Sequence, residues 1–129
     1  MIIGIGSDII DIRRIEKLCL KFGKKFEERI FTEAEIARAN SRSITKTATL
    51  AKRFAAKEAF AKAIGTGIGK ISWKEIEIKN NDDGRPFIEL SGNALNTLNN
   101  ISSSNKKIKI DLTVSDEYPM AIAFVVISA

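Results

Sequence analysis

The chain contains no histidine among its 129 residues. This absence excludes every mechanism that needs an imidazole, including a Ser-His catalytic pair, a histidine-ligated zinc ion and a histidine general base. Any catalysis must therefore use carboxylates, lysines, hydroxyl groups or a hard metal ion bound through oxygen atoms.

Cysteine is nearly absent as well, because Cys19 is the only one and cannot form an internal disulfide. We therefore expect a protein of the reducing cytoplasm. The apolar start at residues 1–10 is too short to span a bilayer and lacks a basic leader or a cleavage site. No membrane partner is expected for this reason.

Aromatic residues make up only 7% of the chain, whereas basic residues outnumber acidic ones and give a net charge of +5. A positive charge favours acidic partners such as nucleic acid, phosphorylated ligands or an acidic protein. Few aromatic side chains and the lack of a recognisable reader motif argue against nucleic acid. With 44% hydrophobic residues, positions 1–129 are expected to form a single domain.

The segment 49–70 is predicted to be a central helix that ends in a glycine run over 65–69. Alanines give it strong helix propensity, and one face is apolar except for Lys57. A lysine on such a face either extends to solvent or meets an anion. Glu58 lies on the flank of this face, where an ordinary ion pair with Lys62 is as reasonable as a functional role. The glycines fit a C-cap and lack the spacing of a phosphate loop.

The remaining pattern predicts an α+β fold, with helices early, an antiparallel sheet late and the long central helix packed on the sheet. In the first strand, Gly4 and Gly6 allow a close approach to the backbone. Asp8 is either the N-cap of the next helix, for which Asp11 competes, or a functional carboxylate. The predicted helices cover 11–20, 22–30, 32–39 and 91–98, the predicted strands 2–9, 72–80, 85–90, 108–114 and 121–127, and a loop 102–106.

The first thirty residues carry a dense basic surface. Its members are Arg13, Arg14, Lys17, Lys21, Lys24, Lys25 and Arg29. A solvated face is the usual explanation of such a run, and a docking surface for an acidic partner is the alternative.

Several of these segments together resemble one family. They are GIGSDIIDIRRIE at 4–16, FTEAE at 31–35, RFAAKEAFAKAIGTGIGKISWKEIEI at 53–78 and DGRP at 83–86. Over essentially its whole length the chain resembles the holo-acyl-carrier-protein synthases, the small bacterial class of 4′-phosphopantetheinyl transferases. The resemblance implies transfer of phosphopantetheine from coenzyme A to a serine of an apo acyl carrier protein, with release of adenosine 3′,5′-bisphosphate.

The resemblance also implies roles for particular residues. Asp8 and Glu58 correspond to the carboxylates that hold Mg²⁺ on the pyrophosphate, and Glu58, directly or through a water, is the expected base for the serine proton. Lys62 is the second expected catalytic residue, because it complements the phosphates. The implied coenzyme-binding residues are Arg53, Lys57, Lys62, Gly65, Arg85 and Pro86.

Members of the family typically form homotrimers with coenzyme A in clefts between subunits, and their first helices meet the acidic carrier protein. The residues implied in docking are Arg14, Lys21, Lys24 and Arg29. One position departs from the family, because many members have Ser-His where this chain has Ser115-Asp116. A carboxylate cannot pair with a 3′-phosphate, so Asp116 is expected to face away or to accept from a backbone amide.

Two other functions are compatible with parts of the sequence. A catalytically silent module could bind a carrier protein through the basic surface alone, although the presence of both Asp8 and Glu58 argues against silence. A small nucleic-acid-binding protein would explain only the charge, and it would show steeply salt-dependent binding.

Overall fold

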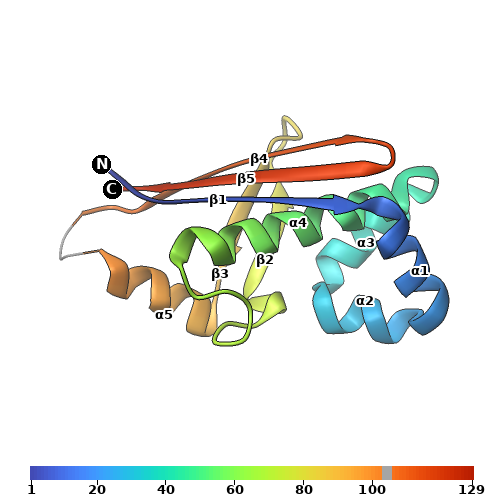
Figure 1. Ribbon diagram of the computed structural model, residues 1–129, viewed down its shortest axis with the longest axis horizontal. Helices are drawn as coiled ribbons and strands as arrows, with labels where there is room; N and C mark the ends of the chain where they lie inside the picture. Colours follow the sequence, from blue (N-terminus) through green and yellow to red (C-terminus); the bar gives the residue numbers. More distant parts are fainter. Residues whose placement is uncertain (103–105) are drawn as a thin grey trace.

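The first strand and the last two strands of the chain form one antiparallel sheet, in the order β1-β5-β4. These strands are β1 (Ile2–Asp11), β5 (Met120–Ser128) and β4 (Lys109–Glu117). The computed structural model describes residues 1–102 and 106–129. In Figure 1 the three strands run side by side along the length of the molecule, and both termini lie at the same end.

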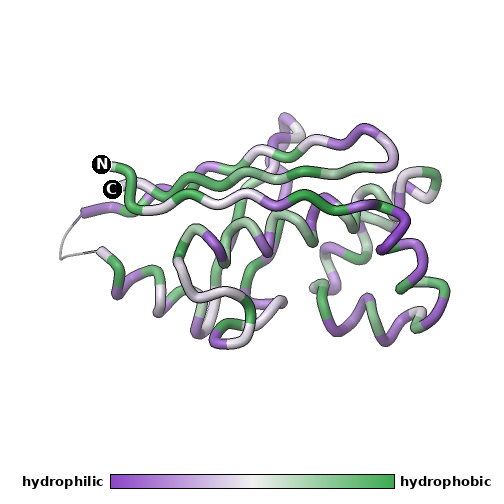
Figure 2. The backbone as a smooth tube through the Cα atoms, in the orientation of Figure 1, coloured by the Kyte–Doolittle hydropathy of each residue, from purple (hydrophilic) through white to green (hydrophobic). Residues whose placement is uncertain are grey.

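Side chains along β5 alternate between buried and exposed, so the sheet has one buried face and one exposed face. Ala123 and Val125 are buried, whereas Ile122 and Phe124 remain 45% and 42% exposed. Figure 2 shows the resulting apolar character along β1 and β5. The outer face of the sheet therefore presents apolar side chains to its surroundings.

Helix α4 (Lys46–Ile64) covers the buried face and lies very close to the backbone of β1. A Cβ atom at Gly6 would lie only 2.0 Å from the carbonyl oxygen of Ala59, and one at Gly4 only 2.0 Å from that of Ala63. This contact confirms the close approach predicted at the two glycines. The helix ends at Gly65, whose φ of 81° is left-handed, as predicted for a C-cap.

Three short helices gather at one end of the molecule (Figure 1): α1 (Ile12–Phe22), α2 (Lys24–Ile30) and α3 (Glu33–Ser41). Asp11, and not Asp8, caps α1 by accepting from the Arg13 amide. The capping box predicted from Thr32 and Glu35 is present at the start of α3. A single 3₁₀ turn, η1 (Ser43–Thr45), connects α3 to α4.

A separate two-stranded sheet consists of β2 (Ile76–Asn80) and β3 (Pro86–Leu90), and β3 lies beside β4. The strand predicted from residue 72 begins later, because η2 (Trp73–Glu75) forms a 3₁₀ turn first. Helix α5 (Gly92–Ile101) follows β3. The loop predicted over 102–106 lies mostly outside the described residues.

The α+β class, the early helices and the central helix packed on an antiparallel sheet are confirmed. Strand β1 belongs to the same sheet as β4 and β5, so the chain starts and finishes in one layer. Within residues 1–102 and 106–129, no helix is long and apolar enough to cross a membrane.

The glycine contact predicts a large effect of a single methyl group. Gly6→Ala should destabilise the protein by about 1–3 kcal/mol, because the Cβ atom forces α4 away from β1. Urea unfolding measures this cost, and transfer activity should fall with it because Asp8 lies on the same strand. Thr113→Ala, on the exposed face of β4, is the control and should cost less than about 0.5 kcal/mol. An equally stable Gly6→Ala variant would contradict the importance of this contact.

Candidate active site

Asp8, Glu58 and Lys62 lie together where β1 crosses α4. Asp8 follows Gly4 and Gly6 on the face of β1 that meets the helix, and its side chain is 18% exposed. The Nζ atom of Lys62 lies 3.1 Å from Oδ1 of Asp8 and 2.9 Å from the carbonyl oxygen of Ser7. Because Asp11 supplies the helix cap, the carboxylate of Asp8 remains available to this cluster.

The two carboxylates influence each other electrostatically. Burial raises the pKa of Glu58, and the negative charge of Asp8 raises it further, whereas Lys62 and Arg14 oppose the shift. Among the described residues, the ion pair of Lys62 is formed with Asp8 and not with Glu58. The ordinary helical pair between Glu58 and Lys62, considered from the sequence, is therefore not the arrangement found.

The donor atoms of this cluster suit a hard cation. The ammonium group of Lys62 already lies against Asp8 Oδ1 and the Ser7 carbonyl, so these oxygens accept a positive charge. In the described part of the chain, no group of three or more His, Cys, Asp or Glu side chains could hold a metal alone. Mg²⁺ is typically bound by one or two carboxylates together with substrate phosphates, and Asp8 and Glu58 fit that mode.

A groove of about 530 Å³ opens beside Glu58, between α1, α2 and α4. Phe54 and Trp73 stack in its wall with ring centroids 4.9 Å apart, and the Arg14 guanidinium lies 5.7 Å from the Phe54 ring. The groove is lined by Arg14, Leu18, Phe22, Lys25, Phe26, Arg29, Ile30, Phe54, Glu58 and Trp73. It therefore combines an apolar wall, a carboxylate and a basic rim.

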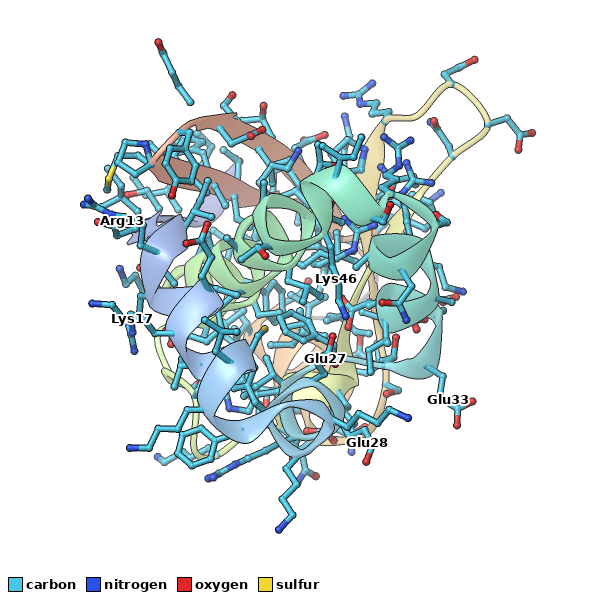
Figure 3. The ribbon with its side chains drawn as sticks, turned by 90° about the vertical axis from the view of Figure 1, so that its right-hand side faces the viewer. Arg13, Lys17, Glu27, Glu28, Glu33 and Lys46 are labelled. Atoms are coloured by element: carbon cyan, nitrogen blue, oxygen red, sulfur yellow. The ribbon has the colours of Figure 1, made fainter. Side chains whose placement is uncertain are left out.

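The four residues predicted to dock a carrier are all exposed, but they do not form one site. Arg14 and Arg29 line the groove beside Glu58. Lys21 lies over the ring of Phe22, and Lys24 lines a different cavity between α2 and α3. In Figure 3, Arg13 and Lys17 project outward from α1, so the basic surface extends around that helix.

Lys57 does not reach a ligand site, which contradicts its predicted role in binding coenzyme A. Its side chain is 0% exposed, and Nζ lies 2.7 Å from Oε1 of Glu35 and 2.9 Å from the carbonyl oxygen of Trp73. Burial lowers the pKa of Lys57, and Glu35 opposes that shift. The anion that meets Lys57 on the apolar face of α4 is thus the buried carboxylate of Glu35.

Arg53 is connected to the turn before Arg85 and Pro86 through the side chain of Asn80. Nη2 of Arg53 donates to Oδ1 of Asn80 at 2.6 Å, and the Asn80 amide donates to the Gly84 carbonyl in the turn that precedes Arg85. Arg53 is 5% exposed, and its Nε has no hydrogen-bond partner among the described residues.

Asp8 and the Arg85–Pro86 turn lie toward opposite edges of the main sheet. Asp8 is on β1, whereas Pro86 begins β3, which packs beside β4. Because neighbouring strands are about 4.8 Å apart, β1 and β4 are separated by roughly 10 Å, and β3 lies farther still. The structure therefore joins Asp8, Glu58 and Lys62, but not the Arg85–Pro86 turn, to one site. Gly65 is the C-cap of α4, and its backbone N–H donates to the carbonyl oxygen of Lys62.

Asp116 forms an ion pair that the sequence did not indicate. Its Oδ1 lies 3.0 Å from Nζ of Lys52 on α4, a different partner from the backbone amide that was one of the two expectations. The two residues are far apart in the chain, and no local pattern connects them. The carboxylate in this position thus holds a lysine at the end of the β4–β5 hairpin.

The chain matches the model of the 4′-phosphopantetheinyl transferase superfamily over residues 4–123 and belongs to that family. It is 49% identical to a holo-[acyl-carrier-protein] synthase of Afipia carboxidovorans, with 100% of this chain and 97% of that protein covered. The fold agrees with the crystal structure of holo-[acyl-carrier-protein] synthase from Neisseria meningitidis, at 41% identity, a TM-score of 0.84 and complete coverage of both chains. It also agrees with the Helicobacter pylori synthase in complex with coenzyme A, at 35% identity, a TM-score of 0.81 and coverage of 96% and 99%.

The raised pKa of Glu58 predicts that neutralising this residue stabilises the free protein. Above its pKa in the folded state, ionised Glu58 lowers the free energy of unfolding, because the folded site disfavours the charge more than the unfolded chain does. Glu58→Gln should therefore raise the melting temperature near neutral pH without ligand. The difference should vanish as pH falls below the ordinary pKa range of a glutamate, where both states are protonated.

Thermal melts of both proteins from about pH 3 to pH 8 measure this difference. Glu117→Gln, which removes an exposed carboxylate at the end of β4, is the control and should leave the melting temperature unchanged. A Glu58→Gln variant that melts lower at neutral pH would show that Glu58 serves as a structural ion-pair partner instead.

Proposed function

We propose that this protein transfers 4′-phosphopantetheine from coenzyme A to a serine of an acidic apo acyl carrier protein. The observation that supports this most strongly is the Asp8, Glu58 and Lys62 cluster beside an apolar groove with a basic rim. The cluster can bind a diphosphate, and the groove can receive an acidic protein. Relatives named holo-[acyl-carrier-protein] synthase match the chain over its whole length.

The proposed chemistry uses two residues of α4. Glu58 accepts the proton of the carrier serine hydroxyl, directly or through a water. The serine oxygen then forms a bond to the β-phosphorus of coenzyme A, and the bond to the departing adenosine 3′,5′-bisphosphate breaks. Lys62, which is 54% exposed, turns from Asp8 to the phosphates and neutralises their charge. Mg²⁺, held by Asp8 and Glu58, would supply further neutralisation of the pyrophosphate.

Arg85 and Pro86, which the family resemblance implies for the adenosine end of the coenzyme, lie toward the other edge of the sheet from Asp8. We propose that Arg53, Arg85 and Pro86 of one copy bind this end while Asp8 and Glu58 of another copy bind the pyrophosphate. The exposed apolar face of the sheet supports such an assembly, because it offers a surface for contact between copies. A homotrimer with coenzyme A between subunits is the assembly proposed.

The direct test incubates apo carrier protein with coenzyme A, Mg²⁺ and this protein. Mass spectrometry should show a carrier that has gained one phosphopantetheine group. Asp8→Asn and Glu58→Gln should lower the rate by about 100-fold or more, since each removes a charge that faces the reacting phosphates. A carrier that binds but gains no mass would favour the silent binding module.

The location of the site between copies predicts complementation. Glu58→Gln and Arg85→Ala should each lower activity alone, but mixing the two chains should restore part of it. Mixed assemblies contain some sites in which an intact Glu58 meets an intact Arg85 from another copy. Light scattering should show a trimer for each variant and for the mixture. Activity that stays at the level of the separate variants, after proven subunit exchange, would place the whole site within one chain.

Charge reversal at the groove should weaken carrier binding selectively. Arg14→Glu with Arg29→Glu should lower kcat/KM for the carrier by about 30–150-fold, on the order of 2–3 kcal/mol, because repulsion replaces attraction. Coenzyme A affinity should stay unchanged, and added salt should narrow the gap.

Lys21→Glu with Lys24→Glu provides the matched comparison for this reversal. Because these residues lie outside the groove, their reversal should cost less than that of Arg14 and Arg29. Equal losses of kcat/KM for the two double variants would indicate that the net charge of the protein steers the carrier. If neither variant lost kcat/KM, the basic surface would be a solvated face without a role in docking.

A further inference from the structure

One buried ion pair joins four elements directly behind the groove. Lys57 on α4 and Glu35 on α3 are both 0% exposed, and their Nζ and Oε1 atoms lie 2.7 Å apart. Glu35 also accepts from the amide of Thr32 at 2.9 Å and from that of Ile78 at 3.0 Å. Lys57 donates in addition to the Trp73 carbonyl. The pair thus fastens the start of α3, the strand β2 and the turn η2 to α4.

Both ends of this network reach residues of the groove. Trp73, whose carbonyl oxygen Lys57 binds, stacks on Phe54 in the groove wall. Glu58 follows Lys57 in the helix and lines the same groove. A change in the position of Lys57 would therefore move both the wall and the carboxylate.

We expect the Lys57–Glu35 ion pair to orient helix α4 more than to increase the stability of the protein. Replacing a buried ion pair by apolar residues often leaves stability unchanged or improves it, so burial alone does not account for Lys57. Charge-assisted hydrogen bonds are short and geometrically specific, and those of Lys57 tie α4 to Glu35 and to the Trp73 carbonyl. Apolar packing at the same place would leave the rotation of Glu58 toward Asp8 less restricted.

We propose that Lys57, through its bond to Glu35, is a positioning residue for transfer. It touches no substrate, and it acts by holding Glu58 and Trp73 where the serine of the carrier meets the Glu58 carboxylate. This inference rests on the proposed function.

The same helix offers a matched control. Lys46 Nζ lies 2.8 Å from Oε1 of Glu27, and in Figure 3 the two side chains point toward each other. This pair also joins α4 to a neighbouring helix, but it borders the cavity between α2 and α3 and not the groove of Glu58.

The test compares the double variant Lys57→Met with Glu35→Gln against the control Lys46→Met with Glu27→Gln. Both doubles remove one positive and one negative charge, and the glutamine at position 35 retains an acceptor for one of the two backbone amides that Glu35 binds. At a temperature where circular dichroism shows both folded, the test double should lose about 10–100-fold in kcat, as expected for a misplaced catalytic group. Its affinity for adenosine 3′,5′-bisphosphate should stay within about twofold of the wild type, since Lys62, Arg53 and Arg85 are unchanged. The control double should keep kcat.

Fluorescence gives a second measurement that requires no activity. Trp73 is the only tryptophan, so its emission reports on the groove wall directly. Emission should shift to longer wavelength in the test double and stay unchanged in the control double. Unchanged emission in the test double would overturn the link between Lys57 and the wall, even if the wild type transferred nothing and the proposed function failed.

Two further results would overturn the positioning role. The first is a folded test double with kcat within about twofold of the wild type, whatever its emission. The second is a failure to fold. If the double variant does not fold, the single variant Glu35→Gln is tested in its place. If neither variant folds, the ion pair is required for folding and has no separate positioning role. A loss of kcat in folded Glu35→Gln, with nucleotide affinity retained, supports the proposal.

Discussion

Helix α4 lies directly on the backbone of β1, and the arrangement of the site depends on that contact. Gly4 and Gly6 make it possible, because any side chain there would collide with helix carbonyl groups. At a wider spacing, side chains would separate the two elements. Their close approach instead lets Asp8 on the strand meet Lys62 on the helix. A strand and a helix far apart in the chain thereby supply one cluster of charges.

The cluster gathers like charges that a purely structural surface would keep apart. Burial raises the pKa of Glu58 and the negative charge of Asp8 raises it further, so the folded protein holds the Glu58 carboxylate at an electrostatic cost. Lys62 offsets part of that cost from an exposed position, where it remains free to turn toward a substrate phosphate. Groups with opposing charge requirements in one cleft are typical of functional sites.

Two lysines of the same helix illustrate how environment decides the role of a side chain. Lys57 is completely buried and bound to Glu35, so its position is restricted and it cannot reach a ligand. Lys62 lies one and a half turns later, is half exposed, and forms a longer ion pair with Asp8. The restricted lysine organises the elements around the groove, whereas the exposed one is available for chemistry. The sequence placed Lys57 on the apolar face of the helix, but it did not show which carboxylate would meet either lysine.

The sequence by itself determined the features that depend on local periodicity and local backbone requirements. Alanine content and a glycine C-cap defined the central helix, the spacing of Thr32 and Glu35 defined a capping box, and the position of Gly4 and Gly6 predicted a close backbone approach. The motifs were also sufficient to identify the family, since they extend along most of the chain. The two carboxylates of the site were found in this way before their proximity was known.

Only the tertiary structure decided which distant residues meet. It paired β1 with β5, bound Lys57 to Glu35, and joined Asp116 to Lys52. It also separated Asp8 from the Arg85 turn by the width of a sheet. Periodicity shows which face of an element is buried, but it does not show against what that face packs. Contacts between residues far apart in the chain depend on the packing of whole elements, and for that reason the partners of these charges could not be read from the sequence.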